Sequence, residues 1–216
     1  MKTIVILISG RGSNMEAILR ARLPVRVACV ISNDPDAKGL ATARAQGIAT
    51  AVVPHRDFQV RAEFDAALAA SIDVHQPDLI VLAGFMRILT DGFIARYHGR
   101  LMNIHPSLLP SFPGLHTHRH ALAAGVRIHG CTVHFLTPAV DRGPIIVQAA
   151  VAVLPGDSEE ALSARVLREE HRIYPQAIRW FCEGRLSLSP DGTVAVHGAR
   201  AGENALENAL RSPVVE

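Results

Sequence analysis

The stretch Asn103-Ile104-His105-Pro106 carries an amide and an imidazole two positions apart, a spacing that could serve chemistry. In an extended strand, side chains at positions i and i+2 point to the same face, so Asn103 and His105 are expected to share a pocket. Asparagine offers a neutral donor and acceptor, and the charge of histidine changes near neutral pH. A polar strand end before a loop stiffened by Pro106 and Pro110 would show the same residues, so the surrounding elements must decide between the two interpretations.

Those elements follow the alternation of an α/β fold. Apolar, β-branched runs predict buried strands at 3–8, 25–31, 49–53, 79–83 and 100–104, and helical spacing predicts helices at 37–46 and 60–75. This order is typical of a single-domain, doubly wound (Rossmann-like) sheet that is mostly parallel. Ligands of such sheets bind beyond the carboxyl ends of the strands, where residues 9–14, residues 84–89 and His105 all fall.

The glycine-containing turn at 9–14 joins the first strand to a helix that Ser13 or Asn14 is expected to cap. Free backbone N–H groups and the helix dipole make such a turn an anion site, and a small phosphate ester is the ligand that we favour. A dinucleotide is a weaker alternative, because the pattern lacks a third glycine although Asp34 lies at a plausible distance for a ribose contact. A plain tight turn is the third interpretation.

Two further loops follow the fourth and fifth strands. The loop at 84–89 surrounds Arg87 with apolar residues, and it either packs into the core or lines an apolar ligand pocket; the sequence slightly favours the core. His116 and His120 would share a helix face, but no carboxylate or cysteine nearby completes a metal site. A histidine-containing loop that leads into a helix at 119–124 is therefore the favoured interpretation, and no metal is expected.

In the last third of the chain, alternating residues at 130–136 and 145–153 predict an antiparallel hairpin that closes the sheet. Asp141 lies in its loop, where ordinary turn chemistry could also explain an aspartate. Asp157 and Glu160 form a predicted capping box that starts a long helix through residue 182, which Pro175 should kink. In that helix Glu170 falls on an otherwise apolar row, so it needs a partner such as a substrate hydroxyl or a histidine.

Composition argues against a nucleic-acid-binding protein and against a membrane protein. The 216 residues suit one domain, and the net charge of +2 comes from scattered basic residues, so we expect no nucleic-acid patch. The apolar run at 4–8 is too short for a membrane span. Three widely spaced cysteines fit neither a disulfide framework nor a metal knuckle, which indicates a cytoplasmic protein. The sequence leaves open whether the protein is a monomer or a homodimer.

Taken in order, five segments closely resemble the phosphoribosylglycinamide formyltransferase family. They are Ser-Gly-Arg-Gly-Ser-Asn (9–14), Ala-Gly-Phe-Met-Arg-Ile-Leu (83–89), Asn-Ile-His-Pro-Ser-Leu-Leu-Pro (103–110), Pro-Gly-Leu-His-Thr-His (113–118), and His134 with Asp-Arg-Gly-Pro-Ile-Ile (141–146). The likeness implies a formyltransferase domain over 1–190 and leaves 191–216 as a loosely held tail. The likeness also implies a cis peptide bond between Leu109 and Pro110. This sequence departs from some family members at Arg142, where they have glycine.

The resemblance implies two substrate sites. The phosphate and ribose of glycinamide ribonucleotide would contact Gly10, Arg11, Gly12, Ser13, Asn14, Arg61 and Glu170. The cosubstrate 10-formyltetrahydrofolate would contact Met86, Arg87, Ile88, Leu89, Asn103, His134, Val140 and Asp141, in a pocket lined by the loops 86–89 and 137–141.

The implied catalytic residues are Asn103, His105 and Asp141. Asn103 and a charged His105 would stabilise the oxyanion that forms when the substrate amine attacks the formyl carbon, and Asp141 would hold His105 charged and move a proton through a water. A formyltetrahydrofolate hydrolase would use the same three residues. A methionyl-tRNA formyltransferase would need a larger, more basic C-terminal part, and a nucleotide-binding module without activity would need only residues 9–14.

Overall fold

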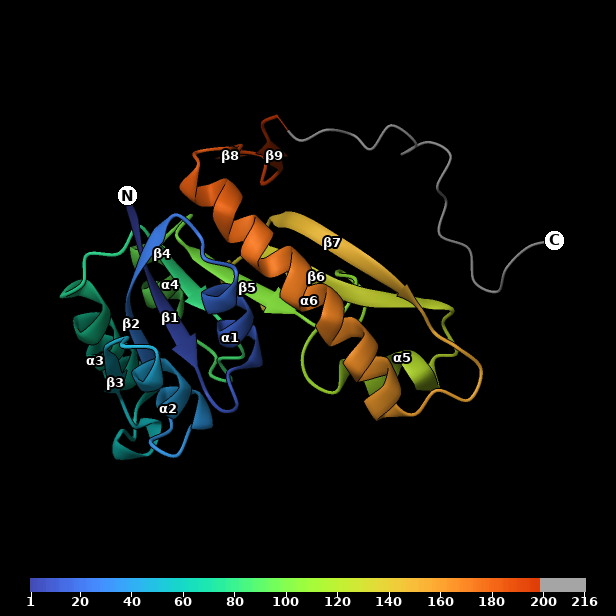
Figure 1. The fold of residues 1–216 in the computed structure, drawn as a ribbon, viewed down its shortest axis with the longest axis horizontal. Helices are drawn as coiled ribbons and strands as arrows, with labels where there is room; N and C mark the ends of the chain where they lie inside the picture. Colours follow the sequence, from blue (N-terminus) through green and yellow to red (C-terminus); the bar gives the residue numbers. More distant parts are fainter. Residues whose placement is uncertain (199–216) are drawn as a thin grey trace.

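The computed structural model describes residues 1–198, and its centre is one seven-stranded sheet (Figure 1). The strands lie in the order β3-β2-β1-β4-β5-β6-β7. Neighbours from β3 to β5 pair in parallel, whereas β6 pairs antiparallel with both β5 and β7. The predicted fold class is confirmed. The strands are β1 (Lys2–Ile8), β2 (Val25–Ser32), β3 (Thr50–Val52), β4 (Leu79–Leu82), β5 (Leu101–His105), β6 (Ile128–Phe135) and β7 (Ile145–Ala152).

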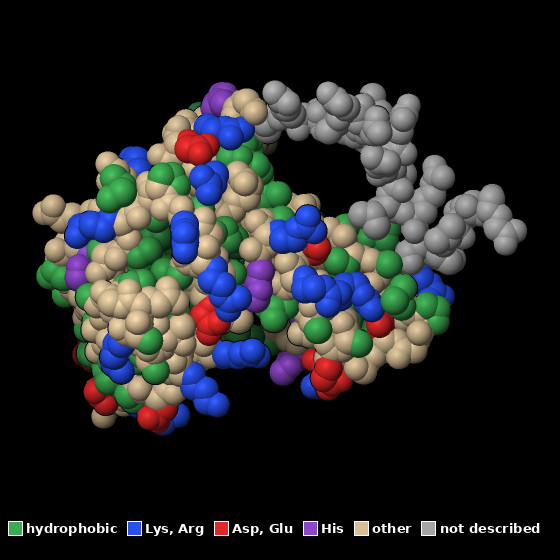
Figure 2. Space-filling model, viewed as in Figure 1, with side chains coloured by type: hydrophobic (Ala, Val, Ile, Leu, Met, Phe, Trp, Pro, Cys, Tyr) green, Lys and Arg blue, Asp and Glu red, His purple; other side chains and the backbone are tan. Residues whose placement is uncertain are grey.

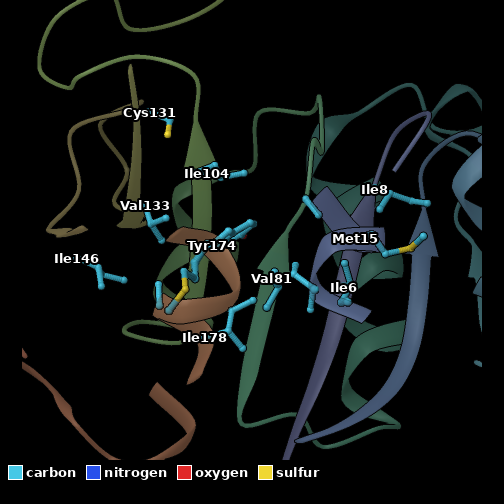
Figure 3. Close-up of a cluster of buried hydrophobic side chains, with 14 of the residues drawn as sticks. Ile6, Ile8, Met15, Val81, Ile104, Cys131, Val133, Ile146, Tyr174 and Ile178 are labelled. Carbon is cyan, nitrogen blue, oxygen red and sulfur yellow. The ribbon is translucent and has the colours of Figure 1, made fainter. Parts of the chain in front are cut away.

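Helices cover both faces of this sheet, because successive side chains of a buried strand point to opposite sides. One hydrophobic cluster takes in α1 (Ser13–Arg20), α2 (Lys38–Ala45), α5 (Thr117–Ala123) and α6 (Glu159–Cys182), and the other takes in α3 (Arg61–Asp73) and α4 (Asp91–Arg96). A short 3-10 helix, η1 (His55–Asp57), follows β3. Along β1, Ile6 faces the first cluster and Leu7 the second. Figure 3 shows Ile6, Val81 and Tyr174 within the first cluster.

The chain continues after α6 into a separate two-stranded antiparallel sheet of β8 (Leu186–Leu188) and β9 (Val194–Val196). The predicted domain boundary at residue 190 falls between these two strands. Most of the expected tail, residues 199–216, lies outside the described residues, so the division of the chain stays a prediction. Within residues 1–198, no helix has the length and apolar character that a membrane span requires. Lys and Arg side chains are spread over the face in Figure 2 among acidic and apolar ones.

Two predicted helix starts are wrong by one or two residues. The helix α1 has Gly12 as its N-cap, in the left-handed conformation with φ of 78°, and no side chain caps it. The long helix α6 is capped by Ser158, whose hydroxyl accepts from the N–H of Ala161. Asp157 does not cap the helix because its carboxylate binds the Arg165 guanidinium. Pro175 lies inside α6, which remains one helix.

Candidate active site

The strand β5 presents Asn103 and His105 at its carboxyl end, where both line a pocket of about 400 Å³. They lie directly opposite His134 and Thr132 of β6 in the antiparallel register. The expectation that an i, i+2 pair in an extended segment shares a pocket is confirmed. Because β6 is antiparallel to β5, it places the imidazole of His134 beside the amide of Asn103, with 3.3 Å between Asn103 Nδ2 and His134 Nε2.

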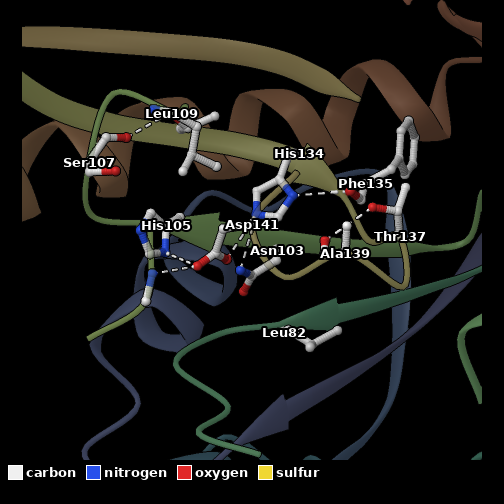
Figure 4. Close-up of polar contacts among 12 residues, drawn as sticks. Leu82, Asn103, His105, Ser107, Leu109, His134, Phe135, Thr137, Ala139 and Asp141 are labelled. Atoms are coloured by element: carbon white, nitrogen blue, oxygen red, sulfur yellow. Dashed lines mark hydrogen bonds and ion pairs between the residues drawn. The ribbon is translucent and has the colours of Figure 1, made fainter. Parts of the chain in front are cut away.

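The loop between β6 and β7 delivers Asp141 to the same pocket (Figure 4). Its carboxylate lies between the two histidines, with Oδ2 at 3.5 Å from His105 Nδ1 and Oδ1 at 3.9 Å from His134 Nε2. The backbone N–H of Gly114 donates to Oδ2 at 2.8 Å. Asp141 adopts a left-handed φ of 52°, a conformation that costs energy for a residue with a side chain. The strained turn therefore aims the carboxylate into the pocket and the Gly114 N–H holds it there.

Backbone carbonyls decide which ring nitrogen of each histidine carries a proton. His105 Nε2 lies 3.0 Å from the carbonyl oxygen of Phe112, and His134 Nδ1 lies 3.0 Å from that of Phe135. A carbonyl oxygen can only accept, so both of these nitrogens must donate. His105 therefore turns Nδ1, its other nitrogen, toward Asp141.

Burial keeps His134 neutral beside Asn103. The His134 side chain is 2% exposed, and its pKa is lowered chiefly by this burial, although the nearby Asp141 charge acts in the opposite direction. With its proton on Nδ1, neutral His134 has a lone pair on Nε2 that accepts one N–H of the Asn103 amide. The amide has a second N–H. His134 thus orients Asn103 and leaves one donor for a ligand in the pocket.

An apolar rim surrounds the mouth of this pocket. Met86, Ile88, Leu115 and Val140 are all more than half exposed, and all four line the pocket. The expectation that the loop at 84–89 packs into the core is therefore wrong for Met86 and Ile88, although Phe85 and Leu89 in the same loop are buried. Exposed apolar side chains gathered around one opening are typical of a site for an apolar or aromatic ligand. The residue-by-residue interpretation of the sequence missed Leu115, although its Pro-Gly-Leu-His segment carried the resemblance.

The glycine turn at residues 9–14 lies at the end of β1, which neighbours β4 in the sheet. The left-handed Gly12 lets the turn approach α2 closely, because a Cβ at Gly12 would lie 3.1 Å from Gly39 Cα. The first N–H groups of α1 have no partner within the helix and no side-chain cap, which suits them to an anion.

Glu170 meets this turn from α6. The Asn14 amide donates to the Glu170 carboxylate at 2.6 Å, so the protein partner of this buried acid is an asparagine and not the predicted histidine, while the substrate hydroxyl stays a prediction. Glu170 is 7% exposed, and burial raises the pKa of its carboxyl while the hydrogen bond from Asn14 lowers it. Asn14 Oδ1 is buried without a partner in the described part of the chain. The structure therefore brings the turn at residues 10–14 and the side chain of Glu170 together.

Other predicted residues lie farther from these contacts. Arg61 is the exposed first residue of α3, and no hydrogen bond or ion pair among residues 1–198 joins it to the glycine turn. Arg87 lines the pocket, and Arg142 is exposed beside Asp141. The bond between Leu109 and Pro110 is cis, as the resemblance implied. Among residues 1–198, no three His, Cys, Asp or Glu side chains gather as a metal ion would require.

Comparison with known proteins agrees with this combination of sheet and site. Residues 2–178 match the model of the formyl transferase family, and the chain belongs to that family. The phosphoribosylglycinamide formyltransferase of Escherichia coli (strain K12) is 52% identical over 189 residues, which cover 86% of this chain and 89% of the relative.

Solved structures agree with this relationship. The glycinamide ribonucleotide transformylase 1 of Symbiobacterium toebii superposes with a TM-score of 0.87 at 50% identity, covering 91% of this chain and 94% of that one. A formyltetrahydrofolate deformylase from Pseudomonas syringae pv. tomato superposes with a TM-score of 0.83 at only 29% identity, and the match covers 90% of this chain and 65% of that one.

Proposed function

We propose that this protein is a phosphoribosylglycinamide formyltransferase, which transfers the formyl group of 10-formyltetrahydrofolate to the amine of glycinamide ribonucleotide in purine biosynthesis. The observation that carries the proposal is a pair of adjacent features. The first is a pocket with an apolar rim that contains Asn103, His105 and Asp141, and the second is the glycine turn after β1, beside β4, which is suited to phosphate. A hydrolase needs the first of these features but has no use for the second.

The pocket fits the folate cosubstrate. Its volume of about 400 Å³ lies within the usual range for small-molecule sites. Met86, Ile88, Leu89 and Val140 supply apolar surface for the aromatic part of the folate, and Arg87 supplies a positive charge for its carboxylates. We infer that the pteridine ring enters between the loops 86–89 and 137–141.

The glycine turn fits the ribonucleotide. Backbone N–H groups from Gly10 to Asn14, together with Arg11, would hold the phosphate at the start of α1. The buried carboxylate of Glu170 would accept from a ribose hydroxyl, a contact that compensates for burying an acid. The exposed Arg61 would add a charge from α3 on the opposite face of the sheet.

The chemistry follows from the donors in the pocket. As the substrate amine attacks the formyl carbon, negative charge develops on the formyl oxygen, and the second N–H of Asn103 and a charged His105 stabilise that charge. Asp141 pairs with His105 through Nδ1 and moves a proton from the attacking amine toward the departing folate nitrogen by way of a water.

The proposal needs no metal ion, and it places the enzyme in the cytoplasm. Support for this compartment comes from the three cysteines, because Cys29, Cys131 and Cys182 are all free. Burial raises the pKa of the Cys131 thiol to about 12, so that it remains protonated and unreactive.

The direct test follows loss of the formyl group from 10-formyltetrahydrofolate with and without glycinamide ribonucleotide. Turnover that depends on the ribonucleotide supports the transferase. Equal turnover without it would establish a formyltetrahydrofolate hydrolase instead, and no turnover would contradict both enzymes.

The catalytic assignment predicts the effect of Asp141→Asn. This variant should lower kcat by about 10²–10⁴-fold because it removes the proton carrier, while the amide oxygen can still accept from Gly114. Asp191→Asn, in the exposed turn between β8 and β9, is the matched control and should retain the wild-type rate. An Asp141→Asn enzyme with unchanged kcat would remove Asp141 from the mechanism.

A further inference from the structure

Ser9 joins two loops that the proposed function assigns to different substrates. It is the first residue after β1, and the loop at 84–89 follows β4, the neighbouring strand. The backbone N–H of Ser9 donates to the carbonyl of Gly84 at 3.2 Å, and the backbone N–H of Met86 donates to the Ser9 hydroxyl at 2.7 Å. These two hydrogen bonds run in opposite directions, so the contact fixes both the distance and the orientation between the loops.

Asn33 sets the direction of the Ser9 hydroxyl. The hydroxyl donates its one proton to Asn33 Oδ1 at 2.5 Å, which leaves only its lone pairs to accept from Met86. Asn33 is 4% exposed at the end of β2, and its own amide nitrogen lies 3.0 Å from His55 Nδ1. A chain of directional hydrogen bonds therefore crosses the carboxyl ends of β4, β1 and β2.

The opposite side of the glycine turn is held by α2. The N–H of Gly39 donates to the carbonyl of Gly10 at 3.0 Å. A Cβ at Gly39 would lie 3.3 Å from the Gly10 and Arg11 carbonyl oxygens, and 2.7 Å from Ile8 Cδ1. The turn is thus packed against the helix and has little room to yield on that side. A change in its position is passed to the loop at 84–89 through Ser9.

We propose that Ser9 is a positioning residue that couples the two substrate sites, so that ribonucleotide bound at the glycine turn raises the affinity of the pocket for folate. The proposal rests on the function assigned above. Ser9 is not among the described residues that line the pocket, so its effect on folate must pass through Gly84 and Met86, which both line it. Coupling between two ligands is reciprocal, and folate must raise the affinity for ribonucleotide by the same factor.

The test uses a pair of ligands that cannot react. Titration calorimetry measures the Kd of tetrahydrofolate, which carries no formyl group, with and without saturating glycinamide ribonucleotide. In the wild-type protein the ribonucleotide should tighten tetrahydrofolate binding about two- to tenfold, the range expected for one neutral hydrogen bond. Ser9→Ala should reduce this ratio, because Met86 loses its acceptor and only the backbone hydrogen bond from Ser9 to Gly84 remains.

Two variants separate coupling from general damage. Ser9→Thr keeps the hydroxyl and should restore the wild-type ratio. Ser71→Ala removes a half-buried hydroxyl on α3 that makes no hydrogen bond within residues 1–198, and it should leave the ratio unchanged. Asn33→Ala frees the Ser9 hydroxyl to rotate and should reduce the ratio, which provides a second measurement if Ser9→Ala does not fold.

The outcomes distinguish this inference from the function on which it rests. A ratio of one in the wild-type protein, or a wild-type ratio in Ser9→Ala, would overturn the coupling while leaving ribonucleotide-dependent turnover intact. A wild-type protein that binds no glycinamide ribonucleotide and shows no turnover would overturn both.

Discussion

Glu170 is an acid at a position where the packing of α6 alone would select an apolar side chain. Leu162, Val166 and Tyr174 occupy the same row of the helix and are fully buried. Among residues 1–198, only Asn14 offers Glu170 a hydrogen bond, and burial raises the pKa of the Glu170 carboxyl. Residues that a function requires often reduce stability in this way. We therefore expect activity and stability to respond in opposite directions at this residue.

The variant Glu170→Gln should have a larger free energy of unfolding than the wild-type protein near neutral pH. In the folded protein the pKa of Glu170 lies above the unfolded value of about 4.3. The stability of the wild-type protein therefore falls as the pH rises from about 4.3 through the folded pKa, whereas the stability of the glutamine variant has no such contribution. Urea unfolding at several pH values should show a gain that is small near about pH 4 and grows toward neutrality. The same variant should raise the KM for glycinamide ribonucleotide.

Glu169→Gln is the matched control, because Glu169 is only half-buried and pairs with the exposed Arg172. It should reproduce neither the stability gain near neutral pH nor the rise in KM. A stability gain in Glu170→Gln that does not grow with pH would show that the buried charge is not what limits stability at this position.

At the scale of elements, the start of α6 depends on a partly buried ion pair as well as on a cap. Arg165 approaches Asp157 with two nitrogens, at 2.7 Å and 2.9 Å, and the N–H of Leu154 donates to the same carboxylate. These donors, led by Arg165, lower the pKa of Asp157 to about 2. The Asp157 side chain is 6% exposed and that of Arg165 is 20% exposed, so solvent reaches the pair mainly from the Arg165 side.

Asp157→Asn should lower the free energy of unfolding by about 1.5–3 kcal/mol at neutral pH, the range for hydrogen bonds to charged groups. The pKa of Asp157 is about 2 in the folded protein, below the unfolded value of about 3.9. Asp157 therefore stabilises the folded protein above about pH 4, and this contribution is lost as the pH falls toward about 2. The difference between variant and wild type should therefore stay constant above about pH 5 and shrink below about pH 4.

Glu159→Gln, two residues further along the chain, serves as the control for this helix start. Glu159 pairs with Arg119 at 3.4 Å on the surface, and such exposed pairs contribute little. Equal losses in the two variants would mean that helix-dipole effects, rather than the ion pair of Asp157, account for the change.

The order and type of most elements could be predicted because buried parallel strands and amphipathic helices leave clear periodicities in the sequence, but the six-residue helix α4 is too short to leave one and was missed. Helix starts were harder to predict, because the N-cap Gly12 is left-handed and packs closely against Gly39, an approach that no local pattern reports. In the site, strand geometry alone predicts that Asn103 and His105 share a face. Their meeting with Asp141 depends on a hairpin and a left-handed turn, so only the resemblance to a family could supply it.

Backbone groups explain the rest of what the sequence could not show. The carbonyl of Phe112 fixes the proton on His105, and the N–H of Met86 reaches Ser9. Such contacts use no particular side chain at the backbone end, so they leave no signature in residue type. They become visible only when the whole sheet is assembled.

For the whole molecule, the sheet separates two hydrophobic cores, and each strand in its centre belongs to both. Leu68 of α3 lies in one core, Ile178 of α6 lies in the other, and both side chains are fully buried. Tyr174 crosses part of this boundary, because its hydroxyl lies 3.0 Å from the Leu82 carbonyl and 2.8 Å from the Met102 carbonyl within the sheet. Whether the two cores act independently decides how far a packing defect reaches toward the active site.

Leu68→Ala should cost about 2–5 kcal/mol of unfolding free energy and Ile178→Val about 0.5–1.5 kcal/mol, because each leaves a cavity in a fully buried position. The two residues share no packing partner in their clusters, so the double variant should show the sum of the two losses to within about 0.5 kcal/mol in urea unfolding. A larger interaction energy would mean that the strands transmit packing changes from one face to the other. In that event a defect under α3 would also displace α6, and the KM for glycinamide ribonucleotide would rise in Leu68→Ala because Glu170 is carried on α6.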